Sequence, residues 1–369
     1  MFMLNKFKLE TMPNTRKITY AEAIREAIDQ CMEEYPSVFI IGEGVPDSKS
    51  VFGTTKGLVK KYGSRVMDMP LSENGLTGVC IGASLMGIRP IMVHIRLDFL
   101  LLAFDQIVNN AAKWHYMFGG QAKVPLVIRA IIGMGWGQGA QHSQNLQAIF
   151  AHIPGLKVVM PSTPYDAKGL LISSIRDNNP VIFIEHRWLY HTWGQVPEEN
   201  YALPLGKSKL VTSGKDITIV SSSYMATETL KAVNALEKAG ISAEFIDLRT
   251  LKPLDDSLII NSVKKTGRLL AVDSGYYTGG FAGEIIARVS EKAFDYLNNP
   301  PQRITLPDIP TPSTPALAKY YYPRHIDIIQ KVCEMLAKPS NEIGQLIESE
   351  RKKDPVHLDV PDESFSGPF

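Results

Sequence analysis

The sequence predicts an α/β protein with two doubly wound domains, the first built on a parallel sheet. Short apolar strands alternate with amphipathic helices, a pattern typical of parallel sheets covered by helices on both faces. The alternation runs over residues 17–192, is interrupted over residues 193–215, and resumes over residues 216–337. The length of 369 residues exceeds what one hydrophobic core usually serves, which also favours two domains.

The first domain opens with an amphipathic helix predicted over residues 20–35. Thr19 and Glu22 have the spacing of a capping box, and apolar residues follow at helical spacing. Ser162, Thr163 and Pro164 start a later helix with a cap and a proline at its first position. The other predicted elements here are strands over residues 37–41, 89–95, 124–131, 157–160 and 181–185, and helices over residues 74–87 and 103–117.

The helix predicted over residues 74–87 consists largely of glycine, alanine, serine and other small residues. Small side chains let a helix approach a neighbouring surface closely, so we expect this helix to pack tightly against another element or subunit.

The second domain is predicted to be smaller, with the same strand and helix rhythm. Residues 193–215 contain the turn-forming pairs Trp193-Gly194 and Ser213-Gly214, so we expect a surface linker there. Strands over residues 216–221, 242–247 and 268–273 and helices over residues 224–239 and 282–297 follow. Residues 1–16 are expected to be a flexible N-terminus, and residues 338–369 a polar, proline-broken tail without a core of its own.

The composition excludes several classes of protein. A formal net charge of +1 gives no sign of nucleic-acid or membrane-surface binding, and 44% hydrophobic residues is ordinary for a globular protein. Cys31, Cys80 and Cys333 are too widely separated for a metal site and are expected to be reduced core thiols. No secretory signal or membrane-spanning segment is found, so a cytoplasmic location is expected. Neither a phosphate-binding P-loop nor the usual dinucleotide or hydrolase motifs occur.

Glu73 is the first candidate catalytic residue, because it lies where a loop enters the small-residue helix. One interpretation is that the carboxylate only caps the helix, as the helix dipole favours. The other is proton transfer, since apolar surroundings formed by Leu71, Leu76 and Val79 would raise the pKa of the carboxyl. These residues alone leave both interpretations open.

His142 is the second candidate, in a glycine-rich segment that we call the histidine loop (residues 133–144). Glycines at every second position from 133 to 139 allow the close backbone approach that a ligand needs. A histidine flanked by Gln141, Ser143 and Gln144 is suited to carry protons, although a solvated loop histidine is the alternative. Taken alone, His94, His115 and Phe99 fit ordinary packing roles.

Several motifs, taken in order, give the chain a resemblance to one family. From about residue 17 to 336 it resembles the β subunit of the thiamine-diphosphate-dependent E1 component of 2-oxoacid dehydrogenase complexes, whose members act on pyruvate, branched-chain 2-oxo acids or acetoin. The matching stretches include Ile41-Gly42-Glu43, Pro70-Leu71-Ser72-Glu73-Asn74-Gly75, Phe104-Asp105-Gln106-Ile107-Val108-Asn109, Gln141-His142-Ser143-Gln144 and Ile246-Asp247-Leu248-Arg249-Thr250-Leu251. The resemblance implies a transketolase-like pyrimidine-binding domain followed by a transketolase C-terminal domain.

The resemblance also implies roles for single residues. Glu73 would hydrogen-bond the N1′ atom of the aminopyrimidine ring of thiamine diphosphate, which activates the cofactor. Phe99 would stack on that ring, and His142 would face the substrate and handle protons or guide the lipoyl group. Leu71 and Glu43 would lie beside the cofactor, with Glu43 as a second carboxylate in the active site.

The resemblance places the remaining parts of the enzyme on other chains. The Gly-Asp-Gly…Asn-Asn signature that binds Mg²⁺ and diphosphate is absent here, so an α subunit would carry it in an α2β2 heterotetramer. The chain alone would then be inactive, and a lipoyl-E2 core would accept the acyl group made from a small 2-oxo acid. In relatives, the loop that matches Ser174, Ile175, Asp177 and Asn179 binds a structural potassium ion.

Two stretches near the implied pocket differ from the family pattern. Residues 93–98 replace a stretch where relatives commonly have an acidic residue and different aromatic residues, and residues 100–102 are unusually aliphatic. The 2-oxo acid is therefore not identified, and two alternatives stay open. One is the C-terminal half of a split transketolase that transfers a ketol unit between sugars, and the other is a non-catalytic scaffold subunit.

Overall fold

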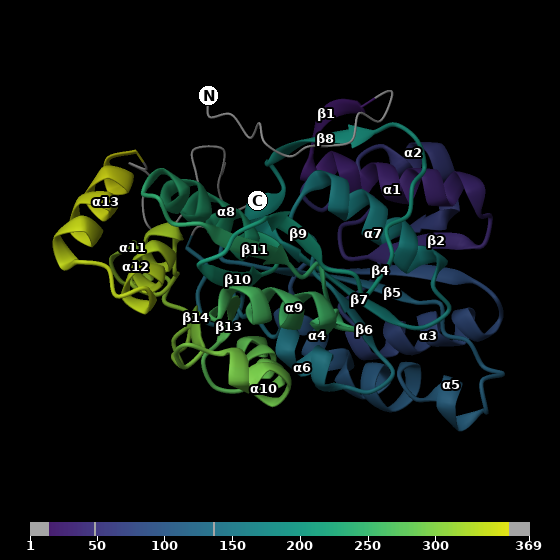
Figure 1. Cartoon of the computed structure of the whole chain (residues 1–369). Helices are drawn as coiled ribbons and strands as arrows, with labels where there is room; N and C mark the ends of the chain where they lie inside the picture. Colours follow the sequence, from purple (N-terminus) through teal and green to yellow (C-terminus); the bar gives the residue numbers. More distant parts are fainter. Residues whose placement is uncertain (1–14, 48, 136, 354–369) are drawn as a thin grey trace.

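Strands and helices form two α/β units in a computed structural model that describes residues 15–47, 49–135 and 137–353 (Figure 1). Most of the expected N-terminal segment (residues 1–14) and the last part of the expected tail (residues 354–369) lie outside the described residues. Within the described part, no helix combines the length and apolar character needed to cross a membrane.

The first sheet has seven strands in the order β12-β6-β7-β5-β4-β2-β3. Its strands are β2 (Val38–Gly42), β3 (Val66–Met67), β4 (Arg89–His94), β5 (Val127–Ile132), β6 (Lys157–Val159), β7 (Val181–His186) and β12 (Thr250–Lys252). All neighbouring pairs are parallel except β12 with β6. The parallel sheet expected from the apolar strands is confirmed, and the antiparallel edge strand β12 was not predicted.

The helices of this unit lie on both faces of the sheet (Figure 1). They are α1 (Tyr20–Glu34), α2 (Leu58–Tyr62), α3 (Glu73–Leu85), α4 (Leu97–Leu100), α5 (Trp114–Met117), α6 (Gln147–His152) and α7 (Pro164–Arg176). Successive residues of one strand enter opposite cores: Ile91 and Val93 pack with the α1 and α7 side, Met92 with the α3 side. Burial on both faces is why these strands are apolar throughout.

The helix starts follow the sequence signals. The Thr19 side chain accepts a hydrogen bond from the Glu22 amide (3.2 Å), and the Glu22 carboxylate accepts one from the Thr19 amide (2.8 Å), which completes the capping box of α1. Thr163 caps α7 by accepting from the Asp166 amide at 3.1 Å, with Pro164 at the first helical position.

The single helix predicted over residues 103–117 is wrong. The backbone instead passes through α4, a 3₁₀ turn (Leu101–Ala103), a π-helical turn (Gln106–Ala111) and the short α5. A π turn inserts an extra residue and shifts the apolar face, which a pattern of 3.6-residue periodicity does not anticipate.

The second sheet has five strands in the order β14-β13-β10-β11-β9. They are β9 (Lys209–Thr212), β10 (Ile217–Ser221), β11 (Ala243–Asp247), β13 (Leu269–Tyr276) and β14 (Gln302–Leu306), and only β9 is antiparallel to its neighbour. Around them lie α8 (Ser223–Lys238), α9 (Asp256–Thr266), α10 (Phe281–Ala293), α11 (Pro315–Ala318), α12 (His325–Met335) and α13 (Ser340–Lys353).

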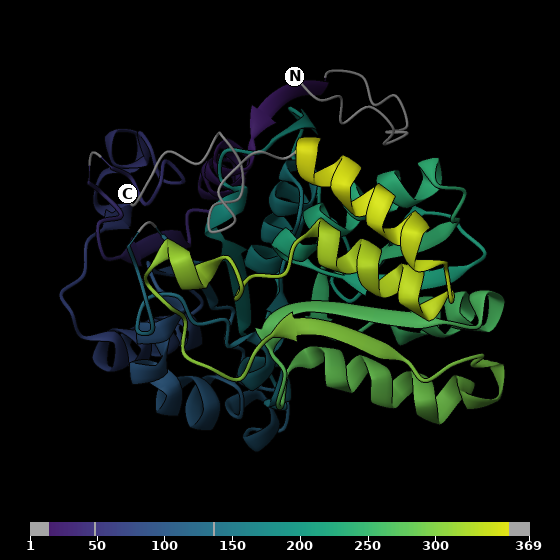
Figure 2. The same cartoon turned by 90° about the vertical axis from the view of Figure 1, so that its left-hand side faces the viewer.

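Two segments expected to lack regular structure form elements. In the expected linker, β8 (Trp193–Pro197) pairs with β1 (Thr15–Thr19), and β9 joins the second sheet. In the expected tail, α13 lies beside α12 (Figure 2). Ile343, Leu346 and Ile347 pack against the core from this helix, so three apolar residues on one face outweigh its polar composition.

Candidate active site

The carboxyl ends of the parallel strands of the first sheet meet at one edge, and the candidate residues follow these ends. Glu43 follows β2, Glu73 follows β3, Phe99 follows β4, and the histidine loop follows β5. Open α/β sheets bind ligands at this edge, where loops leave the strands. Gly42 brings β2 and β4 together just before Glu43, since a Cβ atom at Gly42 would lie 2.5 Å from the Val93 carbonyl oxygen.

Glu73 is the first residue of α3, and only 7% of it is exposed. Its carboxylate accepts no hydrogen bond from any residue that the structure describes. The side chain of Ser72, the N-cap residue of α3, makes no capping hydrogen bond either. The apolar enclosure expected from Leu71 and Val79 is not formed within this chain, because they are 82% and 61% exposed. Val79 lies on α3 and Leu71 lies two residues before it.

Glu43 lies in the same acidic group as Glu73. Burial raises the pKa of the Glu43 carboxyl, and the negative charges of Glu73 and then Asp68 raise it further. Asp68 is held nearby, since its carboxylate accepts a hydrogen bond from the Gly44 amide at 3.0 Å. Three carboxyl groups therefore share the ends of β2 and β3, and we name Glu43, Asp68 and Glu73 the acidic group.

Phe99 and His142 are brought together from separate loops. Their ring centres lie 5.3 Å apart with the rings nearly perpendicular, and Phe99 is 39% exposed. Asp98 fixes the end of the histidine loop by accepting from both the backbone amide (3.2 Å) and the side-chain amide (2.9 Å) of Gln144. The segment after β4 thus positions His142 beside an aromatic face.

Sequence reasoning missed two arginines at this edge. Arg96 follows β4 and Arg187 follows β7, and both are buried. Both guanidinium groups donate to the side-chain oxygen of Gln138 in the histidine loop. Isolated arginines at strand ends carry no motif, and only the departure of residues 93–98 from the family pattern pointed to this place.

His94 and His186 end β4 and β7 and cannot act as proton carriers near neutral pH. Burial lowers the pKa of His94 to about 4. Burial and the charge of Arg96 lower the pKa of His186 to about 3. Both rings are therefore neutral, which leaves His142 as the partly exposed imidazole at this edge.

The second domain contacts the segment that follows the histidine loop. The Asn145 side chain donates to the Ser274 carbonyl oxygen (2.8 Å), and Gln147 donates to the Asp273 carboxylate (2.7 Å). Asp273 also accepts from the Phe281 amide at the start of α10 (3.1 Å), so a carboxylate of the chain already occupies that helix end. The glycine-rich turn over residues 275–283 leads into this helix, and close packing explains its glycines, since a Cβ atom at Gly275 would lie 2.8 Å from the Asp273 carboxylate.

The loop proposed for potassium carries suitable oxygen atoms, and positively charged side chains already bind them. Arg89 donates to the carbonyl oxygens of Ile175 (3.0 Å) and Asp177 (2.9 Å), and Lys157 pairs with the Asp177 carboxylate. The Asp177 carboxylate also accepts from Asn179, while the Ser174 hydroxyl donates to Leu170. Potassium at this loop remains a prediction.

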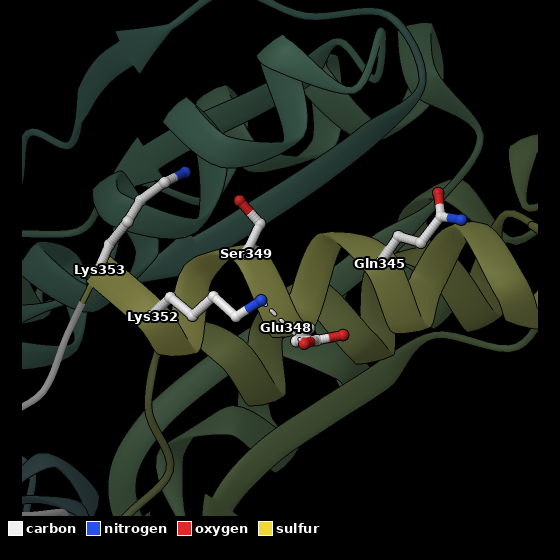
Figure 3. A pocket seen from close by; sticks show the side chains of 5 residues that line it. All are labelled: Gln345, Glu348, Ser349, Lys352 and Lys353. Atoms are coloured by element: carbon white, nitrogen blue, oxygen red, sulfur yellow. Dashed lines mark ion pairs between the residues drawn. The ribbon is translucent and has the colours of Figure 1, made fainter.

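Two further features lie away from this edge. A shallow pocket on α13 is lined by Gln345, Glu348, Ser349, Lys352 and Lys353, with Lys352 paired to Glu348 at 2.9 Å (Figure 3). Figure 1 places α13 at the opposite end of the molecule from α3. Among the described residues, no cluster of three histidine, cysteine or acidic side chains could hold a metal ion.

Comparison with known proteins identifies both domains. Residues 16–192 match the family model "Transketolase, pyrimidine binding domain", and residues 206–328 match "Transketolase, C-terminal domain". A solved structure, described as a split gene transketolase in an inactive β4 tetramer, shares the fold with a TM-score of 0.72. At 24% identity over 87% of this chain and 99% of that one, it bears on the fold alone.

Curated relatives match across nearly their whole length. The β subunit of the acetoin:2,6-dichlorophenolindophenol oxidoreductase of Cupriavidus necator is 48% identical, over 84% of this chain and 94% of the relative. The corresponding Bacillus subtilis subunit is 41% identical, over 88% and 99%. The pyruvate dehydrogenase E1 component subunit β of Gracilaria tenuistipitata var. liui is 47% identical, over 83% and 95%.

Proposed function

The chain belongs to the family of pyruvate and acetoin dehydrogenase E1 β subunits, and from this premise we propose its activity. It is the β subunit of a thiamine-diphosphate-dependent E1 enzyme that oxidatively decarboxylates a 2-oxo acid and transfers the acyl group to a lipoyl group of E2. The observation that carries this proposal is Glu73, a largely buried residue whose carboxylate has no hydrogen-bond donor among the described residues and which lies at the sheet edge that holds Glu43 and Phe99.

The residues at this edge fit the aminopyrimidine half of thiamine diphosphate. The Glu73 carboxylate can accept a hydrogen bond from a protonated ring nitrogen, and the partly exposed Phe99 ring offers a surface for stacking. Leu71 and Glu43 would border the same ring. When bound, the cofactor supplies a nucleophilic carbon for the oxo group and an electron sink for the pair left by the departing carboxyl group.

Glu73 would hold a proton at ring nitrogen N1′ and return it during each turnover. This role needs a carboxyl group within hydrogen-bond reach of the ring nitrogen, so that it can give and take that proton. His142 would donate or accept a proton at the substrate oxygen, since it faces Phe99 and is only partly buried.

A second subunit would complete the site. We propose that an α-type chain carrying the Gly-Asp-Gly…Asn-Asn signature holds Mg²⁺ and the diphosphate group, in an α2β2 assembly. The exposed apolar residues on and beside α3 support such a partner, because a large unburied apolar surface is usually an interaction surface. These residues are Leu71, Val79, Met86 and Leu102.

One assay separates this function from ketol transfer and from a scaffold role. The full chain is combined with an α-type partner, thiamine diphosphate and Mg²⁺, and is given either 2-oxo acids with a lipoyl acceptor or pairs of sugar phosphates. We expect reductive acylation of the lipoyl group and no ketol transfer. Ketol transfer alone would support the split-transketolase alternative, and no turnover by an assembled pair would support the scaffold alternative.

A further inference from the structure

Arg96 and Arg187, which we call the arginine pair, reach across the end of β5 from its two neighbours. β5 lies between β4 and β7 in the sheet, Arg96 follows β4, and Arg187 follows β7. Only 4% of Arg96 and 3% of Arg187 is exposed. The two guanidinium groups therefore meet under the histidine loop, which leaves the sheet from β5.

The arginine pair converges on one neutral oxygen atom. The side-chain oxygen of Gln138 accepts from Arg96 Nη2, from Arg187 Nη1 (3.4 Å) and from the Gly135 amide (3.0 Å). The approach is so close that a Cβ atom at Gly135 would lie 2.1 Å from Arg187 Nη1. Three donors, two of them charged, thus surround an acceptor that carries no net charge.

An oxyanion satisfies such a group of donors far better than an amide does. Charge-assisted hydrogen bonds from guanidinium to carboxylate or phosphate are about twice as strong as neutral ones. The two buried guanidinium groups also repel each other, and a bound anion relieves this repulsion. Burial and the charge of Arg96 lower the pKa of Arg187 to about 10. Burial also lowers the pKa of Arg96, and the negative charge of Asp98, which accepts a hydrogen bond from Gln144, partly opposes this.

We propose that the arginine pair is a binding site for an oxyanion, and that the Gln138 side-chain oxygen takes the place of the ligand oxygen in the unliganded chain. Gln138 is only partly buried, and Gly137 beside it is exposed with φ of 73°. Outward rotation of the Gln138 side chain would release the two guanidinium donors that it now accepts from. The ligand then receives the donors that Gln138 releases.

The ligand class follows if the proposed function holds, on which this step rests. The carboxyl group that a decarboxylase removes must lose its charge, and two fixed cations would stabilise the charged form and oppose the reaction. The arginine pair therefore binds a second anionic group, at the end of the substrate remote from the oxo group. Arg96 stands three positions before Phe99, which joins this anion site to the proposed cofactor surface.

A binding measurement that needs no enzyme activity tests the site. The full chain is titrated calorimetrically with inorganic phosphate and with glutarate. We expect the wild-type chain to bind both anions. Arg187→Met should weaken their affinity by about 30-fold or more, because one buried charge partner of the anion is lost. Gln138→Ala should bind more tightly, a gain that misfolding cannot produce. Arg89→Met, at the opposite edge of the sheet, is the matched control and should bind as wild type does.

Gln138→Glu gives the sharpest result, because it places a carboxylate between the arginines. This variant should lose phosphate and glutarate binding and should unfold at a higher temperature than wild type. Lack of binding by both wild type and Gln138→Ala overturns the site. A Gln138→Glu variant that binds either anion as wild type does overturns it as well.

The substrate assignment has its own readout in the reconstituted enzyme. We expect the ratio of kcat/KM for 2-oxoglutarate to that for 2-oxobutyrate to exceed one, and to fall by about 30-fold or more in Arg187→Met. A ratio that Arg187→Met does not change overturns the assignment, even if phosphate binds. Absence of turnover with every 2-oxo acid contradicts the proposed function instead, and the titrations still decide the anion site.

Discussion

The acidic group and the arginine pair lie at the ends of different strands of the first sheet. The acidic group lies at the ends of β2 and β3, while the arginine pair lies at the ends of β4 and β7. Phe99 follows β4, as Arg96 does, and the loop that carries His142 follows β5, which lies between β4 and β7. This polarity would orient a ligand with its cationic ring toward Glu73 and its anionic end toward Arg187.

The contact between Glu43 and Glu73 can be tested through the pKa of Glu43. Because the negative charge of Glu73 raises that pKa, Glu73→Gln should lower it, and burial should keep it above the ordinary glutamate value. Carboxyl-carbon NMR of labelled glutamate measures the change. Asp68→Asn is the matched comparison and should produce a smaller fall. An unchanged Glu43 pKa in Glu73→Gln would mean that the two carboxyl groups are not neighbours.

The candidate site was partly predictable from the sequence, for a physical reason. Glu73 and His142 each lie in a motif that a single short segment of sequence contains. Glu73 lies where a loop enters a helix, and His142 lies in a glycine-rich loop. Arg96, Gln138 and Arg187 are scattered along the chain and gain their meaning only from the strand order that brings them together. No local pattern contains that information.

At the scale of elements, a short strand from beyond β11 joins the two domains. β12 pairs with β6 in the first sheet, and Arg249 just before it forms an ion pair with Asp166 of α7 at 2.6 Å. Asp247 lies beside this pair and accepts from the Ser162 hydroxyl and the Arg249 amide. The interface thus buries two carboxyl groups around one arginine.

This interface should give stability a defined pH dependence. Burial, and then the charge of Asp166, raises the pKa of Asp247 to about 6. A carboxyl group whose pKa is raised by folding contributes stability below its unfolded pKa and loses that contribution as pH rises through its folded pKa. Asp247→Asn cannot ionise, so its stability relative to wild type should increase between about pH 5 and about pH 7. Urea unfolding at both values measures this, and a constant difference would contradict it.

The C-terminal helix α13 should contribute to stability through its apolar face. Leu346→Asp should lower the free energy of unfolding by about 1–2 kcal/mol, because a charge replaces a half-buried apolar group. Glu348→Ala on the exposed face is the control and should change it by less than about 0.5 kcal/mol. Thermal and urea unfolding measure both, and equal effects would mean that α13 does not pack on α12.

Sequence patterns predicted some helices and strands of this fold and not others. Helices with a cap and a long apolar stripe, such as α1 and α7, were predicted with their starts. β8, β9 and β12 are short and form because a partner strand lies beside them, so their own residues carry little signal. The helix α13 was not predicted in the expected tail, because only one face of this helix is apolar.

At the scale of the whole molecule, the two domains share their cores and leave one surface exposed. Each of the two hydrophobic clusters contains strands of both sheets, so β10 packs in the same clusters as β4. By contrast, apolar residues on and beside α3, the helix that begins with Glu73, are exposed. The two domains are therefore packed together, while the apolar surface beside α3 stays exposed.

The most direct test is turnover by the pair of this chain with an α-type subunit, in the presence of thiamine diphosphate, Mg²⁺ and a 2-oxo acid. We expect the pair to decarboxylate the substrate and the chain alone to be inactive. Glu73→Gln should lower kcat by about 10²–10⁴-fold while it still assembles with the partner. Glu33→Gln, an exposed carboxylate on α1, should be fully active. An assembled Glu73→Gln enzyme that turns over at the wild-type rate would contradict the account.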